Sequence, residues 1–277
     1  MKDISSHLTF LVIADAHLCG GEEKRTEDFF RILDQIDSLP RDCAIVFLGD
    51  IFELWVALKS YEDPLHARFL SWCRNAIHNR TVVFLEGNHE FYVTQTRHEA
   101  FTKVSPHELS IGGIRFAHGD RINRADYSYR LLRILLRNPF TRLLAALCGP
   151  FFGPAAADKI RRSLKNSNRK HKKFFPENAI ERHLLEMAEQ KKKDRLLVLG
   201  HFHRSIRREA HGCTLHVVPA FQDQGEIAVI HCPGKVESAV VEIGNAEKLI
   251  FSLHSRKMLS FPQEKAKPQE KEKMKND

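Results

Sequence analysis

Five short polar blocks along the chain carry side chains that can bind metal ions. Together they contain seven candidate ligands: Asp15, His17, Asp50, Asn88, His118, His201 and His203. Nitrogen and oxygen ligands without a thiolate favour manganese, iron or zinc over magnesium or calcium, and do not choose among the three. Two divalent ions about 3.5 to 4 Å apart need a shared ligand, and the carboxylate of Asp50 is suited to bridge them. The chemistry that these residue types predict is hydrolysis assisted by two metal ions.

Each block directly follows a short apolar run with the pattern of a buried β-strand. The five runs are 8–14, 44–48, 81–85, 114–117 and 196–199. In an open α/β sheet, the loops that leave the carboxyl ends of the strands converge on one crevice. Glycines in four of the blocks let the backbone turn sharply and keep Cβ atoms away from a ligand. We therefore expect the seven side chains to meet at one edge of a sheet.

The remaining pattern predicts a layered α/β sandwich with mixed sheets in one domain over 1–260. Further strands are expected at 214–218, 226–230, 237–243 and 249–253, and helices at 26–38 and 63–78. The segment 124–191 is helical in pattern, with breaks expected near Pro139, between Gly149 and Pro154, and near Pro176. The charged end, 261–277, has few apolar residues, so we expect a disordered tail outside the fold.

The composition excludes several classes of protein. With 43% hydrophobic and 28% charged residues, the chain can bury a full core. Its six cysteines are scattered without a CxxC pair, which indicates reduced thiols rather than a disulfide framework or a zinc finger. The longest nearly apolar stretch, 143–157, is about 15 residues long and contains glycine and proline, whereas a spanning helix needs roughly 20 residues. We therefore expect no transmembrane helix, and the N-terminus has no export signal.

The order of the five blocks resembles the pattern of the calcineurin-like metallophosphoesterases, which is D-x-H, G-D, G-N-H-[DE], a histidine in H-G, and G-H-x-H. This resemblance covers about residues 8–235 and implies a four-layer αββα sandwich. It implies that two ligand sets share one carboxylate: Asp15, His17, Asp50 and His203 for one ion, and Asp50, Asn88, His118 and His201 for the other. It also implies that His89 protonates the leaving oxygen or stabilises the transition state.

Finer features resemble the UDP-2,3-diacylglucosamine diphosphatases of lipid A synthesis. They are a basic helical insertion at 124–191 and the residues 48–55, Phe91, 118–120, Asp126, Tyr127, 137–139 and 223–225. This resemblance implies cleavage of UDP-2,3-diacylglucosamine to UMP and 2,3-diacylglucosamine 1-phosphate. Those enzymes usually carry Arg and Asp after the asparagine, whereas this chain has His89 and Glu90. That difference favours, as the alternative, another phosphodiesterase or phosphomonoesterase of the same superfamily.

Positive charge is concentrated in residues 121–173, which contain 14 Lys and Arg against two Asp in a chain of net charge +8. Leucines alternate there with arginines, which is typical of amphipathic helices. The segment is either a solvated helical cap or a lid that buries acyl chains and meets an anionic membrane surface or the substrate diphosphate. Nucleic acid is disfavoured as a partner, because the segment has no RNA-reading module or stacking platform. As a lid it would contact substrate through Arg161, Lys165 and Arg169, which lie four residues apart on one helical face. The resemblance to the diphosphatases adds Asp126, Ser163 and Asn166 as candidate substrate contacts.

Taken together, the sequence predicts a hydrolase with two divalent ions, manganese first and iron or zinc as alternatives. We expect a lipid-nucleotide substrate and a cytoplasmic location, peripheral on the inner membrane. A non-catalytic scaffold with the same fold is the alternative from a different class of protein. The intact set of seven candidate ligands argues against a scaffold.

Overall fold

A computed structural model gives the fold over residues 9–123, 127–171, 175–190, 194–232 and 239–260. Of the helical residues 128–130, 132, 163–171 and 256–260, the structure describes the backbone alone. Asp126 and the predicted tail, 261–277, lie outside the described residues.

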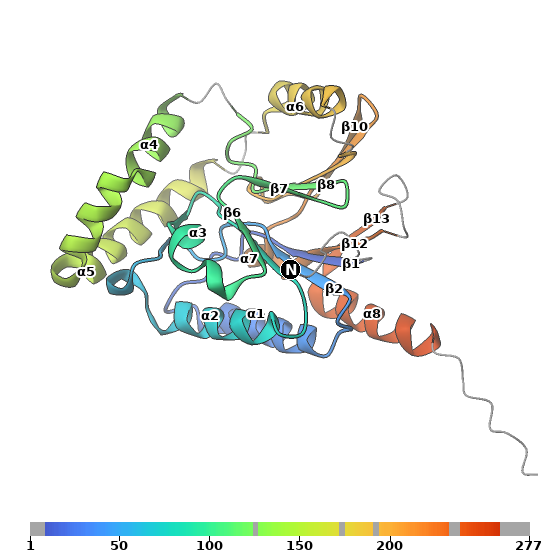
Figure 1. The fold of residues 1–277 in the computed structure, drawn as a ribbon, viewed down its shortest axis with the longest axis horizontal. Helices are drawn as coiled ribbons and strands as arrows, with labels where there is room; N and C mark the ends of the chain where they lie inside the picture. The colour runs from blue at the N-terminus through green and yellow to red at the C-terminus, as the bar shows by residue number, and fades with distance from the viewer. Residues whose placement is uncertain (1–8, 124–126, 172–174, 191–193, 233–238, 261–277) are drawn as a thin grey trace, which may run out of the picture.

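Two β-sheets stack face to face at the centre of the molecule (Figure 1). The first contains β1 (Thr9–Ile13), β2 (Cys43–Phe47), β4 (Val82–Leu85), β6 (Lys103–Ser105), β12 (Glu226–His231) and β13 (Val240–Asn245), in the order β13-β12-β1-β2-β4-β6. The second contains β7 (Glu108–Ile111), β8 (Ile114–Ala117), β9 (Leu196–Leu199), β10 (Ile206–Ala210) and β11 (Cys213–Val217), in the order β10-β11-β9-β8-β7. Strand β1 is parallel to β2, and β2 to β4, while β8 is parallel to β9. The loops that carry the five polar blocks therefore all leave carboxyl ends of parallel strands.

Helices cover the outer faces of both sheets. On the first sheet lie α1 (Glu23–Asp37), α2 (Pro64–Ala76) and α8 (Ala246–Ser260), and on the second lies α6 (Glu177–Glu189). Figure 1 shows α6 above the sheets and the other three helices below them. The short elements are β3 (Trp55–Val56), β5 (Glu90–Phe91), α3 (Val93–Thr96), α7 (Phe221–Gln224), and the 3-10 turns η2 (Lys59–Tyr61) and η3 (His98–Ala100). The expected four-layer αββα sandwich is confirmed.

Alternation along the central strands explains why each sheet is covered on both faces. In β1, Leu11 and Ile13 pack against the helices, whereas Phe10 and Val12 pack between the two sheets. All four side chains are buried. Burial of one such side chain contributes about 1.5 to 3 kcal/mol. The continuous apolar runs of the sequence therefore correspond to strands with two buried faces.

One predicted strand, 249–253, is wrong, because these residues lie in α8. Five consecutive apolar residues do not distinguish a strand from a buried helix by periodicity alone. Ala246 and Ile250 are buried against α1 and the first sheet, and Leu249 and Leu253 pack beside them. This spacing of three, four and seven residues is that of one helix face.

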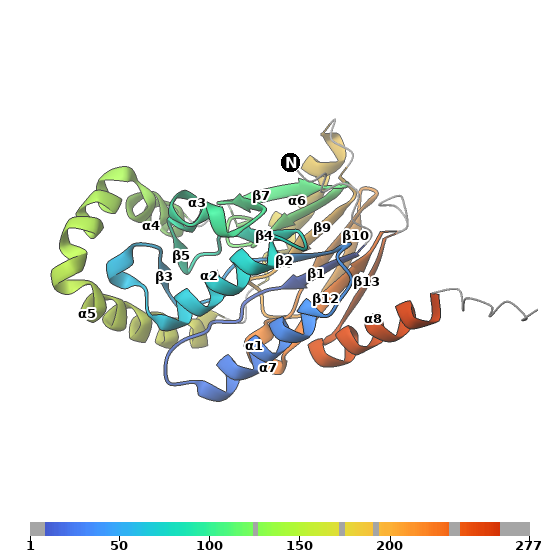
Figure 2. The same ribbon diagram turned by 60° about the horizontal axis from the view of Figure 1, so that its bottom comes forward.

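Between β8 and α6, the chain forms a pair of helices, α4 (Tyr127–Arg137) and α5 (Pro139–His171), that projects from the sandwich (Figure 2). The break predicted near Pro139 is present, but α5 continues through 149–154. A Cβ on Gly149 would lie 2.8 Å from the Tyr61 ring, and one on Gly153 would lie 2.7 Å from the Ser60 carbonyl oxygen. These glycines allow α5 to approach η2 closely. By contrast, α6 belongs to the outer layer of the sandwich and not to the projecting pair.

Part of α5, Pro139–Arg162, is long and apolar enough to cross a membrane by length and composition alone. The segment is longer than the nearly apolar run 143–157, on which the expectation of no transmembrane helix rests. Length and composition alone do not show a membrane span, so that expectation stays a prediction. In the structure this segment packs on η2 and is otherwise largely exposed.

Candidate metal centre

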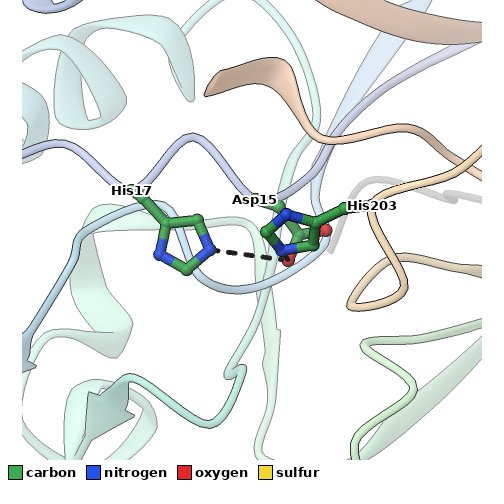
Figure 3. Close-up of side chains that lie close together, drawn as sticks. All are labelled: Asp15, His17 and His203. Atoms are coloured by element: carbon green, nitrogen blue, oxygen red, sulfur yellow. Dashed lines mark ion pairs between the residues drawn. The ribbon is translucent and has the colours of Figure 1, made fainter. Parts of the chain in front are cut away.

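The seven candidate ligands lie together where the strands of both sheets end. Three groups of side chains have ligand atoms within 4.8 Å of one another: Asp15, His17 and His203; His17, Asp50 and His89; and Asp50, His118 and His201. The Asn88 amide oxygen lies 3.1 Å from His118 Nε2 and so joins the third group. Figure 3 shows how His17 and His203 converge on the carboxylate of Asp15 from different loops. His17 and Asp50 each belong to two of the three groups, and of these two Asp50 has the carboxylate that could bridge a pair of ions.

Five of the seven candidate ligands have a backbone conformation that residues other than glycine rarely adopt. Their φ angles are positive: 53° at Asp15, 46° at His17, 52° at Asp50, 67° at His201 and 52° at His203. Such conformations cost of order 1 to 3 kcal/mol each and persist where the surrounding structure imposes them. Here hydrogen bonds between the loops impose them, for example from the Asp15 amide to the Gly49 carbonyl and from the His17 amide to the Asp50 carbonyl. The sequence offers no simple signal for this strain.

Glycines leave the space that the ligands occupy. A Cβ on Gly87 would lie 2.1 Å from Asp50 Oδ1, and one on Gly200 would lie 2.8 Å from Asp15 Oδ2. Gly49 has a φ of 87°, and a Cβ there would lie 2.6 Å from Nδ1 of His118. Any larger residue at these positions would displace a candidate ligand.

Two histidines are held from outside the centre by hydrogen bonds through Nδ1, and a third faces a carboxylate there. His89 Nδ1 donates to the Glu53 carbonyl oxygen at 2.6 Å, whereas His17 Nδ1 lies 3.3 Å from a carboxylate oxygen of Glu53 and has no hydrogen-bond partner among the described residues. His118 Nδ1 lies 2.9 Å from the Leu48 carbonyl oxygen. A histidine whose Nδ1 donates a hydrogen bond keeps Nε2 free to accept a metal ion.

The fourth histidine, His203, is contacted from α7 by a hydrogen bond in the opposite direction. The side-chain amide of Gln222 donates through Nε2 to His203 Nδ1 at 3.1 Å, and His203 Nε2 lies 3.4 Å from Asp15 Oδ1. The Nε2 atoms of His89 and His118 lie 3.8 Å and 3.3 Å from Asp50 Oδ2. Four Nε2 atoms, including that of His17, therefore face two carboxylates.

Each of the two carboxylates has one oxygen fixed by the backbone and the other turned inward. Asp50 Oδ1 accepts from the His89 amide at 2.9 Å, and Asp15 Oδ2 accepts from the His201 amide at 2.8 Å. Asp15 Oδ1 and His17 Nε2 are buried without a hydrogen-bond partner among the described residues. Buried polar atoms without partners are costly, and a divalent cation would satisfy both. The residues present therefore fit a pair of metal ions.

Glu90 holds the loops of the centre together from behind. Its fully buried carboxylate accepts from the amides of Asp50 at 2.8 Å, Ile51 at 2.6 Å and Gly87 at 2.7 Å. Burial and the nearby negative charge of Asp50 raise the pKa of Glu90 to about 8. Glu90 thus fixes the relative position of the loops that follow β2 and β4.

The electrostatics of the centre favour added positive charge. Burial opposes ionisation of Asp50, but the charges of His89 and His118 outweigh it and hold the pKa of Asp50 well below its usual range. Burial likewise opposes protonation of His118, but Asp50 raises the pKa of His118 to about 10. Burial and the charge of His118 lower the pKa of His201 to about 4. The buried negative charge of Asp50 favours the protonated form of His118. The same negative charge would attract divalent cations.

Of the six expected substrate contacts, the side chain of Arg161 alone is described. Its guanidinium lies 3.1 Å from Asp63 Oδ2 and 3.2 Å from Asp158 Oδ1, so two carboxylates balance its charge. Asp126 lies outside the described residues, as do four side chains of α5: Ser163, Lys165, Asn166 and Arg169.

Sequence reasoning gave no role to Glu53, Glu90 or Gln222, although each contacts a candidate ligand or its loop. For two of them a sequence signal existed. Glu53 stands in an otherwise apolar segment close behind a predicted strand, and Glu90 is the acidic residue of the block that contains Asn88 and His89. A carboxylate in such a place must be paired, because isolated buried charges are strongly unfavourable.

Comparisons with known proteins identify the family of the chain. A family model described as calcineurin-like phosphoesterase matches residues 8–230. The chain is 28% identical over 231 residues to a UDP-2,3-diacylglucosamine hydrolase of Shewanella baltica, a match that spans 81% of this chain and 94% of the relative. A protein of the same name from Shewanella sp. strain ANA-3 is 28% identical over 235 residues, with the same coverage.

The solved structures found as similar share little sequence with this chain. Vacuolar protein sorting 29 from Cryptosporidium parvum is 11% identical, with a TM-score of 0.43, over 85% of this chain and 96% of that one. An archaeal phosphodiesterase is 8% identical, with a TM-score of 0.41, over 85% of this chain and 99% of that one.

Proposed function

The chain belongs to the calcineurin-like phosphoesterase family, and we propose that it hydrolyses the diphosphate of UDP-2,3-diacylglucosamine to UMP and 2,3-diacylglucosamine 1-phosphate. The family assignment makes it a metal-dependent phosphoester hydrolase. The observation that carries the proposal is the buried arrangement of three metal-capable groups, two of which share Asp50. The choice of substrate is supported by the name of the Shewanella relatives, whose match spans 94% of their length.

We assign the two ligand sets as the sequence suggests: Asp15, His17, Asp50 and His203 for one ion, and Asp50, Asn88, His118 and His201 for the other. When bound, two divalent ions lower the pKa of water and neutralise the phosphoryl oxygens. We favour manganese, with iron and zinc as alternatives.

His89 is the proposed acid. Its Nδ1 is fixed by the Glu53 carbonyl oxygen at 2.6 Å, and its Nε2 faces the centre beside Asp50. This orientation lets Nε2 donate a proton to the leaving oxygen of the substrate. A positioned general acid typically contributes about 10² to 10⁴-fold to the rate.

The projecting helices α4 and α5 supply the proposed site for acyl chains and for contact with an anionic membrane. Phe140, Phe151 and Phe152 are 75%, 79% and 67% exposed, and several leucines beside them are also exposed. Exposed apolar surface on this scale marks a site of interaction. Exposed cations on the same helix, Lys159 and Arg162, suit anionic lipid head groups. We therefore propose that the enzyme works peripherally at the cytoplasmic face of an inner membrane.

The proposed substrate contacts are Asp126, Arg161, Ser163, Lys165, Asn166 and Arg169, which rest on the sequence. Arg161 would reach the substrate only by leaving Asp63, to which it is paired in this structure.

Product analysis tests the proposed function. The purified protein with manganese is incubated with UDP-2,3-diacylglucosamine and, separately, with bis(p-nitrophenyl) phosphate. We expect UMP and 2,3-diacylglucosamine 1-phosphate from the lipid nucleotide, at a kcat/KM well above that for the aryl diester. Hydrolysis of the aryl diester alone would favour the second candidate, a phosphodiesterase with another substrate. The histidine at position 89, in place of the arginine usual in the diphosphatases, is the observation that supports this second candidate.

A further inference from the structure

Arg137, near the end of α4, extends from the projecting helices to the loop between β4 and β5. Its Nη2 donates to the Gly87 carbonyl oxygen at 2.5 Å and to the Glu90 carbonyl oxygen at 2.6 Å. Its Nη1 donates to Glu86 Oε2 at 2.7 Å. The side chain of Arg137 is 14% exposed, so these bonds are largely shielded from water.

The two carbonyl groups that Arg137 joins stand on either side of Asn88 and His89. Asn88 is the candidate ligand of the second ion, and His89 is the proposed acid. A single planar guanidinium therefore closes the ends of the turn that presents both side chains. Glu86, the third acceptor, is itself fixed by the Thr94 amide at 2.8 Å. The contact is thus a rigid clamp on one catalytic loop.

A second contact joins α4 to the loop that carries His118, which is another candidate ligand of the second ion. Arg133, one helical turn before Arg137, forms an ion pair with Asp120 and donates to the Pro106 carbonyl oxygen at 3.1 Å. Asp120 follows His118 by two residues, and His118 Nε2 lies 3.1 Å from the Asn88 amide oxygen. One face of α4 therefore holds both loops whose side chains meet at this half of the centre.

We propose that Arg137 is a positioning residue, which sets the geometry of Asn88 and His89 and couples the projecting helices to the metal centre. This inference rests on the proposed function in one respect, because it takes Asn88 as a ligand of the second ion. In this proposal Arg137 positions Asn88 and His89 in addition to anchoring α4 on the sandwich. An anchor needs one strong contact, whereas Arg137 contacts the carbonyl oxygens on both sides of the two functional residues.

The test compares Arg137→Gln, Arg137→Lys and a control, Arg142→Gln. Arg142 is exposed at the start of α5 and donates to Gln95 at 2.7 Å, away from the Asn88 turn. The first measurement is manganese binding by competition with a chelating dye, which needs no turnover. The second is kcat and KM for bis(p-nitrophenyl) phosphate, which does not need the lid to hold acyl chains. Thermal unfolding of each variant serves as the check on folding.

For Arg137→Gln we expect the affinity for the more weakly held ion to fall about 10 to 100-fold, as is usual when a residue that orients metal ligands is removed. We expect kcat at saturating manganese to fall by a similar factor, with KM for the aryl diester changed by no more than about threefold. Arg137→Lys should recover little, because a single ammonium nitrogen cannot replace both Nη2, which contacts the two carbonyl oxygens, and Nη1, which contacts Glu86 Oε2. Arg142→Gln should match the wild type in both measurements.

Unchanged manganese affinity and kcat in a folded Arg137→Gln variant would overturn the proposal and leave Arg137 as an anchor of α4. Full recovery by Arg137→Lys would also overturn it, since charge alone would then suffice. These outcomes are distinct from failure of the proposed function. A wild type that binds two ions and cleaves the aryl diester but not the lipid nucleotide would refute the substrate alone. A wild type that binds fewer than two ions would refute the metal pair before any variant is compared.

Discussion

The metal edge of the sandwich and the projecting pair α4 and α5 are opposites in their physical chemistry. At the edge, polar side chains such as Asp15 and His118 are almost fully buried, and several loops hold strained backbone conformations. On the projecting pair, large apolar side chains such as Phe140 and Phe151 are exposed. The contrast teaches that this chain fixes the geometry of its polar groups at the metal edge and leaves apolar surface exposed on the projecting pair, where we propose that lipid is bound.

The two regions make separate predictions for mutations. A change at the edge should alter metal binding and turnover on every substrate. A change on the projecting pair should alter only the use of substrates or surfaces with apolar chains. The following variants test that division, from the largest expected effect to the smallest.

Asp50→Asn should abolish the centre, because it removes the negative charge and one oxygen ligand that we propose both ion sites share. We expect hydrolysis of bis(p-nitrophenyl) phosphate to fall by at least about 10³-fold, since a bridged metal pair supplies several kcal/mol of transition-state stabilisation. Elemental analysis should show loss of at least one ion per chain. A variant that keeps two ions and full activity would remove Asp50 from the role of bridge.

Gly87→Ala should disturb the same carboxylate without changing any polar group. The added Cβ would lie 2.1 Å from Asp50 Oδ1, so the loops must move apart. Overpacking of this kind costs about 1 to 3 kcal/mol, and we expect turnover and manganese affinity to fall by about tenfold or more. Gly20→Ala is the matched control, because nothing lies within 4 Å of a Cβ at that position. Equal behaviour of the two variants would show that the centre tolerates displacement of Asp50.

Replacing Phe151 and Phe152 with Ser should affect the projecting pair alone. Burial of a phenylalanine contributes about 1.5 to 3 kcal/mol, so we expect binding to phosphatidylglycerol vesicles to fall by about tenfold or more. The KM for the lipid nucleotide should rise, and hydrolysis of bis(p-nitrophenyl) phosphate should be unchanged. The control is Phe251→Ser on α8, which removes a phenylalanine that is 73% exposed elsewhere. If both variants lose vesicle binding equally, the projecting pair is not the membrane contact.

Asp63 joins the sandwich to α5 and should have a small effect on stability. It caps α2 by accepting from the amides of Leu65 and His66, and it pairs with Arg161. Loss of such a cap costs about 1 kcal/mol, so Asp63→Ala should lower the free energy of unfolding by about that amount. The measurement is urea unfolding at neutral pH, with Asp63→Asn as the variant that keeps a capping oxygen. If Asp63→Ala leaves the free energy of unfolding unchanged, the cap has no role in stability.

The pH dependence of Asp63 has a definite sign. Burial opposes its ionisation, but hydrogen bonding to His66 outweighs this and lowers the pKa of Asp63 from 3.8 to about 2. A carboxylate with a lowered pKa in the folded state stabilises the fold above its unfolded value, and this stability is lost as the pH falls toward the folded value. The advantage of the wild type over Asp63→Asn should therefore shrink between about pH 4 and pH 2. An advantage that is constant over this range would contradict the assignment.

Much of the fold could be predicted because the central strands are apolar on both faces and each is followed by a polar block. The run 249–253 could not be assigned, since packing of Ile250 against the first sheet decides its conformation. The helix break expected at Gly149 is absent for a similar reason: the glycines serve close contact with η2, which lies far away in the sequence.

The candidate site could be predicted as a set of residues but not as a geometry. Convergence of the seven side chains follows from strand order, whereas their roles as ligands stay a prediction. The outer contacts of Glu53 and Gln222, and the clamp by Arg137, depend on loops that meet only in the folded chain. No local pattern in the sequence encodes such meetings.

Anomalous diffraction from crystals grown with manganese tests the central claim most directly. We predict two peaks about 3.5 to 4 Å apart with the Asp50 carboxylate between them. One should be surrounded by Asp15, His17 and His203, and the other by Asn88, His118 and His201. A single peak, or a pair of peaks away from Asp50, would contradict the account.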